Sequence, residues 1–310
     1  MEAMISKWPS LNYSAMAGTI QTVHLWTQVV GKIRLVQTPW INHAWHVTLY
    51  ISPAGLSTGS VPWDGGIFEI EFDFNTDELV IRLSNGKSAK VSLKNLSVAD
   101  FYQSLMEHLK HLGLETEIYA SPNEIESPIP FAEDKTHADY DHDQINSLWQ
   151  ALVLIHNCFQ KFRAGFIGKC SPVHMFWGAF DLAVTRFSGR KAPLHPGGAP
   201  HIPLRVMQEA YSHEVSSAGF WPGNEQFPYP SFYSYCYPTP ADFASQPIKT
   251  GKAFYSTDLG EFLLKYDDVV ATENPEDTLL EFLQTTYEAA ANTGNWDRDA
   301  LEFDFSSFEK

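Results

Sequence analysis

The chain has 310 residues, enough for one large domain or two half-sized ones. Aromatic residues at 14% and charged residues at 19% exclude a disordered chain, which would be poor in aromatics and rich in charge. The formal net charge of -16 argues against nucleic acid as a partner, because binding phosphates requires clusters of Lys and Arg, and the sequence has none.

Cysteine content and the N-terminus bear on the compartment. Cys158, Cys170 and Cys236 form no CxxC pair, which favours neither a disulfide framework nor a thiolate zinc site. The first thirteen residues lack the basic start and apolar run of a signal peptide, and no stretch approaches the ~20 apolar residues of a membrane helix. We therefore expect a cytoplasmic protein without a membrane partner.

The first half of the chain predicts an α+β lobe, residues 1–119. Apolar residues recur at helical spacing at its beginning and end, and strand patterns lie between them. Asn85-Gly86 predicts a hairpin turn, Ser97 the cap of the second helix and Gly113 its end. The predicted segments are helices over 19–36 and 98–112, and strands over 43–52, 67–74, 78–84 and 87–93.

Residues 120–141 are expected to be an acidic linker, because they contain three prolines, many acids and no sustained periodicity. The second lobe, residues 142–310, repeats the order of helix, antiparallel strands and helix. Its predicted segments are helices over 144–166 and 278–291, and strands over 174–187, 213–221, 232–237 and 261–270. The fold class is therefore α+β, with two lobes that each form an antiparallel sheet flanked by helices. The shared order suggests a pseudo-duplication, although such an order also arises by chance and no residue-level repeat accompanies it.

The stretch SPVHMFWGAFDLAVTRFSGR is the most unusual, because charged side chains lie among apolar ones. In one continuous strand, His174 and Arg186 share one face and Trp177 and Asp181 the other, unless a bend at Gly178 brings His174 and Asp181 together. A charge in such surroundings is costly without a partner. Asp181 and Arg186 therefore either form a buried pair that orders the sheet or serve a binding site.

A second cluster, YSHEVSSAGFWPG, places His213 beside Glu214 and ends in Phe220 and Trp221. Adjacent residues of a strand point to opposite faces, so one of His213 and Glu214 is expected to face a pocket. The neighbouring serines lack a GxSxG context, and a serine nucleophile is not favoured. Among the aromatic residues that follow, Phe232, Tyr233, Tyr235 and Tyr237 are packing groups or the lining of a cavity.

His43 and His46 lie at the start of the first predicted strand, at a spacing that suits a loop or one helical turn. Imidazole is the commonest protein ligand for transition metals. With His174, His213 and a carboxylate, they would form a two-histidine, one-carboxylate site for a divalent metal. Packing histidines that make ordinary hydrogen bonds are the alternative.

The loop SGRKAPLHPGGAPHIP is rich in Gly and Pro and contains Arg190, Lys191, His195 and His201. It is either a lid over an anionic ligand or a plain surface loop. The charge distribution is compatible with an anion, because residues 144–250 contain eight Lys or Arg against five Asp or Glu, whereas residues 115–143 contain nine acids and one base. Neither Gly-rich nucleotide motif is present.

The motifs NHAWHVTLY, SPVHMFWGAFDLAVTRFSGR and AYSHEVSSAGFWPG resemble those of a bacterial protein family of uncharacterised function. The resemblance extends over nearly the whole chain. It implies one complete cytoplasmic protein, and it supplies no catalytic assignment.

Three functions remain open: an enzyme acting on a small anionic substrate, a protein that binds a small ligand without catalysis, and motifs that serve only the fold. In the enzyme, a histidine acts as general base or metal ligand, Arg186 holds an anionic group and Asp181 orients its neighbours. The predicted site comprises the catalytic residues His174, Asp181, Arg186, His213 and Glu214, the ligand-binding residues Trp177, Arg190, Phe220 and Trp221, and the metal ligands His43 and His46.

Overall fold

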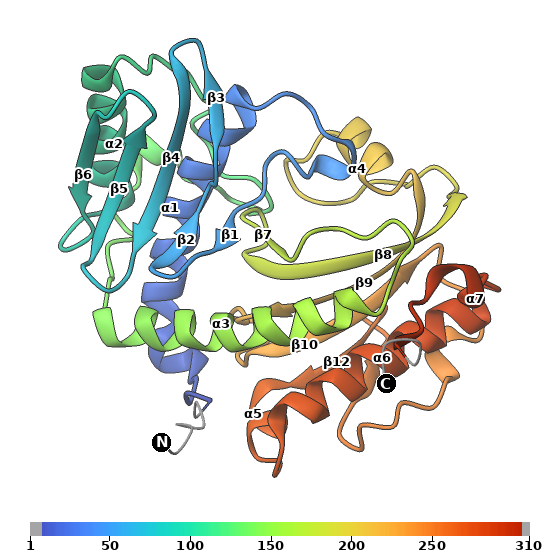
Figure 1. Ribbon diagram of the computed structural model, residues 1–310. Helices are drawn as coiled ribbons and strands as arrows, with labels where there is room; N and C mark the ends of the chain where they lie inside the picture. Colours follow the sequence, from blue (N-terminus) through green and yellow to red (C-terminus); the bar gives the residue numbers. More distant parts are fainter. Residues whose placement is uncertain (1–7, 306–310) are drawn as a thin grey trace.

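The computed structural model describes residues 8–305. They form an α+β fold of two antiparallel sheets with helices packed on them, as predicted (Figure 1). Residues 1–7 and 306–310 lie outside the described residues. They include the outer ends of the two predicted lobes and part of the N-terminal segment on which the signal-peptide prediction rests. Within residues 8–305, no helix combines the length and apolar character needed to cross a bilayer.

The first sheet has six strands in the order β1-β2-β4-β5-β6, with β3 also paired to β4. The predicted hairpin is present, because β5 pairs with β6 across the Asn85-Gly86 turn. Ser97 and Asp100 form a capping box at the start of α2, and Gly113 ends it in the left-handed conformation. The elements are α1 (Tyr13–Gln37), β1 (Tyr50–Ile51), β2 (Gly55–Ser57), β3 (Val61–Trp63), β4 (Gly66–Asp73), β5 (Glu78–Leu83), β6 (Ser88–Ser92) and α2 (Val98–Leu112).

The strand predicted over 43–52 is wrong for most of its length. Only Tyr50 and Ile51 form a strand, Leu49 pairs as a single bridge with Met175, and a short 3-10 helix, η1 (Asn42–Ala44), precedes them. His43 and Ala44 have left-handed backbones with φ of 60° and 56°, which a strand cannot contain. The carboxylate of Glu209 holds this turn by accepting the backbone N–H of His43 at 2.8 Å. A partner more than 160 residues away therefore decides this local conformation.

The second sheet has six antiparallel strands in the order β11-β12-β10-β9-β8-β7. Helices α3 and α6 pack against one of its faces. Helix α4 lies on the side of the opposite face (Figure 1). The elements are η2 (Phe131–Glu133), α3 (His142–Ala164), β7 (His174–Phe176), β8 (Asp181–Lys191), α4 (Leu204–Ala210), β9 (His213–Trp221), β10 (Ser231–Tyr237), η3 (Phe243–Ser245), β11 (Phe254–Ser256), β12 (Glu261–Lys265), α5 (Tyr266–Val270), α6 (Pro275–Thr293) and α7 (Arg298–Leu301).

Two predicted strands of this lobe are interrupted. The run 174–187 is not one strand, because the chain reverses at 177–180 and Phe176 pairs with Asp181. Phe180 closes this reversal in a left-handed conformation, with φ of 58°. The run 261–270 is a strand only as far as Lys265 and continues as α5, whose first turn carries Asp267 and Asp268. Acidic side chains there favour a helix N-terminus.

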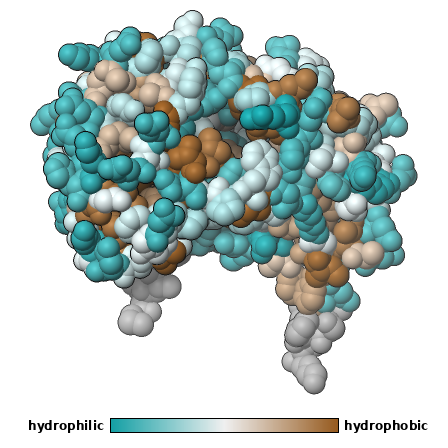
Figure 2. Space-filling view, turned by 90° about the horizontal axis from the view of Figure 1, so that it is seen from above, coloured by the Kyte–Doolittle hydropathy of each residue, from teal (hydrophilic) through white to brown (hydrophobic). Residues whose placement is uncertain are grey.

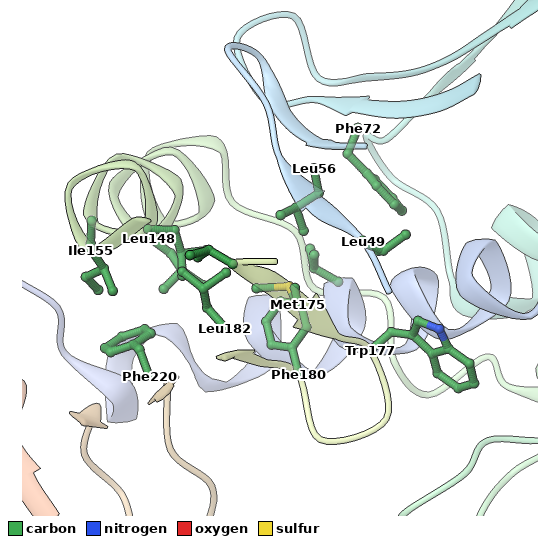
Figure 3. Close-up of a cluster of buried hydrophobic side chains, with 14 of the residues drawn as sticks. Leu49, Leu56, Phe72, Leu148, Ile155, Met175, Trp177, Phe180, Leu182 and Phe220 are labelled. Atoms are coloured by element: carbon green, nitrogen blue, oxygen red, sulfur yellow. The ribbon is translucent and has the colours of Figure 1, made fainter. Parts of the chain in front are cut away.

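The two lobes share one hydrophobic core. Leu49 of the first lobe and Met175 of the second exchange both backbone hydrogen bonds, at 2.9 and 2.8 Å. Figure 3 shows Leu49 and Phe72 near Met175 and Leu182 in a continuous cluster. Helix α1 is buried along most of its length and contacts α2 and α3, so it belongs to both lobes.

Candidate functional site

A cavity of about 770 Å³ lies where the lobes meet. One face of the second sheet forms its floor, since the lining residues of its strands alternate in sequence, as the pleat requires, apart from Cys236 of β10. The walls come from several segments. They are residues 40–47 of the first lobe, the turn after β7, residues 123–124, the loop before α4, and α4 itself. The floor residues are Asp181, Ala183, Thr185 and Phe187 of β8, Val215, Ser217 and Trp221 of β9, Ser231, Tyr233, Tyr235 and Tyr237 of β10, and Glu261 and Leu263 of β12.

The segments that border the cavity also expose apolar side chains. Trp40 is 53% exposed, Leu194 78% and Leu204 51%. Figure 2 views the molecule from the top of Figure 1, where α4 lies, and shows apolar residues in brown interrupting a largely hydrophilic surface. The surroundings of the cavity therefore offer contacts to the apolar part of a ligand.

Three carboxyl groups line the cavity: Glu124, Asp181 and Glu261. Burial raises the pKa of Asp181 to about 6. Burial, and secondarily the charge of Asp181, raise the pKa of Glu124 and of Glu261 to about 7. The Tyr233 hydroxyl donates a hydrogen bond to Asp181 Oδ2. Among the described residues, no Lys or Arg lines the cavity to balance these acids. Its basic side chains are His43, His46 and His195, whose pKa values burial lowers.

Hydroxyl groups of tyrosine, serine and threonine side chains line the cavity beside the acids. The hydroxyls of Tyr211 and Tyr235 lie 2.8 Å apart, and those of Thr185 and Ser217 lie 2.9 Å apart. Burial raises the pKa of Tyr211, and those of Tyr233 and Tyr235 further, so the phenols remain protonated at neutral pH. The floor therefore presents hydroxyl groups able to donate or accept hydrogen bonds.

Three glycines make room for cavity groups. A β-carbon at Gly178 would lie 1.8 Å from Glu124 Oε1, and one at Gly219 would lie 2.3 Å from the Tyr233 hydroxyl. A β-carbon at Gly31, in the middle of α1, would lie 2.1 Å from the Trp177 ring. Real side chains do not approach so closely, so each glycine permits one of these placements.

Helix α1 places Glu124 in the cavity by holding the preceding residue. Gln28 Nε2 donates to the Asn123 carbonyl at 2.9 Å, and the Asn123 N–H donates to Gln28 Oε1 at 2.8 Å. Lys32 Nζ donates to the Asn123 side chain. The Glu124 N–H donates to the Pro200 carbonyl at 2.9 Å. This part of the predicted linker is therefore fixed between α1 and the loop before α4.

Strained backbone occurs at several positions around the cavity. Glu124 has a φ of 60°, and Phe180, directly before Asp181, has a φ of 58°. His43 and Ala44, which line the cavity, share this left-handed conformation. Such conformations are uncommon outside glycine and are often found at functional sites.

Of the predicted site residues, five line the cavity: Asp181, Trp177, Trp221 and the two assigned metal ligands, His43 and His46. Phe220 does not, because it lies on the opposite face of β9 and packs against Phe232 and Tyr266. Trp177 donates its indole N–H to the Val47 carbonyl at 2.8 Å.

Arg186 lies behind the cavity floor, where it is 1% exposed. Its guanidinium donates to the Phe162 carbonyl and lies 3.5 Å from the centroid of the Phe162 ring and 4.3 Å from that of Tyr287. Asp181 and Arg186 therefore occupy opposite faces of β8 and form no ion pair. Arg186, which was predicted to hold an anionic group, does not line the cavity.

His213 and Glu214 diverge, as expected for neighbours in a strand. Glu214 accepts hydrogen bonds from Ser188 at 2.8 Å and from Arg190 at 2.6 Å, on the face away from the cavity. His213 points to the cavity side of β9 but lies beyond the lining residues, with its ring 5.8 Å from that of His43. Glu214 and Arg190 therefore form a structural pair in this conformation.

The histidines assigned to a metal have other neighbours. His43 Nδ1 donates to the Ala210 carbonyl at 2.8 Å, which leaves Nε2 as the acceptor for Lys169 Nζ. His46 Nδ1 lies 3.3 Å from the Ile41 carbonyl. His174 is fully buried between the rings of Trp45 and Phe176, and burial lowers its pKa to about 3. Across residues 8–305, no three His, Cys, Asp or Glu side chains converge in a way that would hold a metal ion.

Glu124 and Glu261 were not predicted as site residues, because they lie in a predicted linker and at a strand end. Four aromatic residues were considered as cavity lining: Tyr233, Tyr235 and Tyr237 line the cavity, and Phe232 does not. The glycines at 178 and 219, each next to bulky aromatic residues, were the available signal that large groups approach the backbone there.

No curated protein and no solved structure matches the chain. One family does, described as "Family of unknown function (DUF5996)", and its match covers residues 8–303. This agrees with the resemblance to an uncharacterised family and includes both sheets and every segment that lines the cavity. The chain belongs to the DUF5996 family.

Proposed function

We propose that the protein binds a small organic molecule in the cavity between its lobes. The observation that carries this proposal is the cavity itself: its volume falls within the range of ligand sites, and its largely apolar walls surround a few convergent polar groups. The glycines and strained residues that shape it are further support, since they introduce energetic costs that packing alone does not require.

Catalysis at this site is a second candidate, favoured by the pKa values of its acids. Asp181 and Glu124 ionise near neutral pH, with pKa values of about 6 and 7. One carboxyl can therefore be ionised while its neighbour is protonated, the arrangement required for paired general base and general acid. Conversion of a bound molecule, followed by NMR in the presence of the protein, would separate an enzyme from a binding protein.

The proposal also covers the cellular compartment, the absence of a nucleic-acid partner and the charge of the ligand. The three cysteines are free, which supports a reducing compartment such as the cytoplasm. The absence of a nucleic-acid partner stays a prediction. A small anionic ligand is less well supported, because the cavity-lining residues that the structure describes include no Lys or Arg.

Filling the cavity tests the proposal. In a thermal-shift screen of small metabolites, a ligand present at 100 times its Kd should stabilise the protein by about 2.7 kcal/mol. Ala183→Phe, from the floor, and Val206→Trp, from α4, should abolish this shift, because each places a large side chain in the cavity. Ala164→Trp, at an exposed position of α3, is the matched control.

Circular dichroism would first establish that the filled variants fold. A ligand that binds both filled variants as tightly as the wild type would place its site elsewhere and contradict the proposal.

A further inference from the structure

We infer that the cavity selects an organic cation, such as a primary amine with an apolar body, and that Glu124, Asp181 and Glu261 bind its charged group. This inference rests on the proposed binding function and adds the chemical class of the ligand. It depends on the charge of the lining, on the partners of the acids and on the aromatic walls.

The acids of the cavity differ from the buried acids that stabilise the fold. Asp77 is 4% exposed and accepts hydrogen bonds from Tyr140 at 2.7 Å and from His142 at 2.8 Å, while Lys94 lies 2.9 Å away. Asp134 is 1% exposed and has His137 at 2.7 Å. This chain therefore pairs the buried carboxylates that have structural roles, as physical chemistry requires.

The cavity acids have no such compensation. Tyr233 donates to Asp181, but no described side chain donates a hydrogen bond to the carboxylate of Glu124 or Glu261. The Lys and Arg side chains close to the cavity have other partners: Lys32 bonds to Asn123, Lys169 bonds to His43, and Arg186 lies behind the sheet. Three acids around one cavity whose described lining has no Lys or Arg leave a cationic group to be supplied by the ligand.

The walls suit the body of such a ligand. Trp45, Trp177 and Trp221 line the cavity together with the tyrosines of the floor. Aromatic faces attract cations, and quaternary ammonium groups and amines are commonly bound in aromatic cages. The carboxylates and the aromatic rings therefore both favour a positively charged ligand.

A metal ion does not fit the arrangement. The three acids come from the segment before η2, from β8 and from β12, and the described residues include no group of His, Cys, Asp and Glu that would enclose a metal. Acids distributed around a cavity of about 770 Å³ fit a larger ligand with a charged group and an apolar body.

Matched probes test the ligand charge. Isothermal titration calorimetry at pH 7.5 would compare phenylbutylamine, phenylbutanol and phenylbutyrate, and likewise the amine, alcohol and carboxylate of the hexyl and indolylalkyl scaffolds. We expect each amine to bind at least tenfold more tightly than its alcohol, and the carboxylates to bind most weakly. Wild-type protein should also release protons on binding an amine, because the cation favours the ionised acids.

Carboxamide variants locate the effect. Glu124→Gln, Asp181→Asn and Glu261→Gln should each weaken amine binding by about tenfold and change alcohol binding by less than twofold. Glu126→Gln, an exposed acid two residues from Glu124, should change neither. Proton release provides a measurement on the unmodified protein in case a variant does not fold. The titratable groups that line the cavity with the acids are the tyrosines Tyr211, Tyr233, Tyr235 and Tyr237 and the histidines His43, His46 and His195.

The results of these titrations distinguish failure of the cation inference from failure of the proposed binding function. Alcohols or carboxylates that bind as tightly as the amines, and lose binding in Ala183→Phe, would overturn the cation inference and leave the binding function intact. Amine binding that all three carboxamide variants retain would also overturn it. No binding by any of the nine probes would count against the proposed function itself.

Discussion

Asp181 illustrates at the scale of one residue how a binding group can weaken the fold that contains it. Its carboxyl lies at the start of β8 beside a hydroxyl donor but without a basic partner. Burial raises its pKa from 3.8 to about 6. Because the folded protein holds this proton more tightly than the unfolded chain, the associated stability is present below pH 4 and is lost as the pH rises through 6.

Asp181→Asn is therefore expected to stabilise the ligand-free protein at pH 8. The amide keeps an acceptor for Tyr233 and removes a half-buried charge, so the free energy of unfolding should rise by about 2 kcal/mol at pH 8. The difference from wild type should shrink toward zero at pH 4. Urea denaturation at the two pH values measures it.

Asp242→Asn is the control, because Asp242 is exposed, and its stability should match wild type at both pH values. A stability gain for Asp181→Asn of equal size at pH 4 and pH 8 would show that the charge of Asp181 is not the cause.

At the scale of elements, local patterns predicted the helices better than the strands. The apolar spacing and the caps of α2 are properties of a short segment, and α2 forms as predicted between Ser97 and Gly113. The strand predicted over 43–52 was wrong because the Glu209 carboxylate, from a distant helix, fixes a turn there. A long-range contact thus overrides a local preference.

Helix α1 is expected to control the placement of the segment that carries Glu124. Gln28→Ala removes both hydrogen bonds to Asn123 and leaves buried backbone groups without partners, at a cost of about 2 kcal/mol. Amide hydrogen exchange should increase in residues 119–126, and urea denaturation should show the loss of stability. Gln150→Ala, on an exposed face of α3, should change neither quantity. Unaltered exchange around Asn123 in Gln28→Ala would show that other contacts hold the segment.

At the scale of the molecule, the two sheets depend on one core. Leu49 and Met175 join them by backbone hydrogen bonds, and buried residues of both lobes form one cluster. Helix α1 is buried along most of its length and contacts α2 and α3. The cavity is therefore built between elements that are expected to unfold together.

Unfolding is accordingly predicted to be a single transition. The calorimetric and van't Hoff enthalpies should agree, and far-ultraviolet circular dichroism and tryptophan fluorescence should give the same midpoint, because neither lobe keeps its core alone. Two resolved transitions would contradict this prediction and indicate that the lobes fold independently.

The sequence by itself determined the α+β class, the two antiparallel sheets, most helices and the Asn85-Gly86 hairpin, because periodicity, caps and turns act over a few residues. It also predicted that Asp181 and Arg186 occupy opposite faces in a strand. Only the tertiary structure decided which face meets the cavity, since α3 and α6 cover the face that holds Arg186. It likewise brought Glu124 to Asp181 through contacts between residues almost one hundred positions apart, such as Gln28 with Asn123. Burial and the partners of a charge depend on the packed chain, and no local pattern contains them.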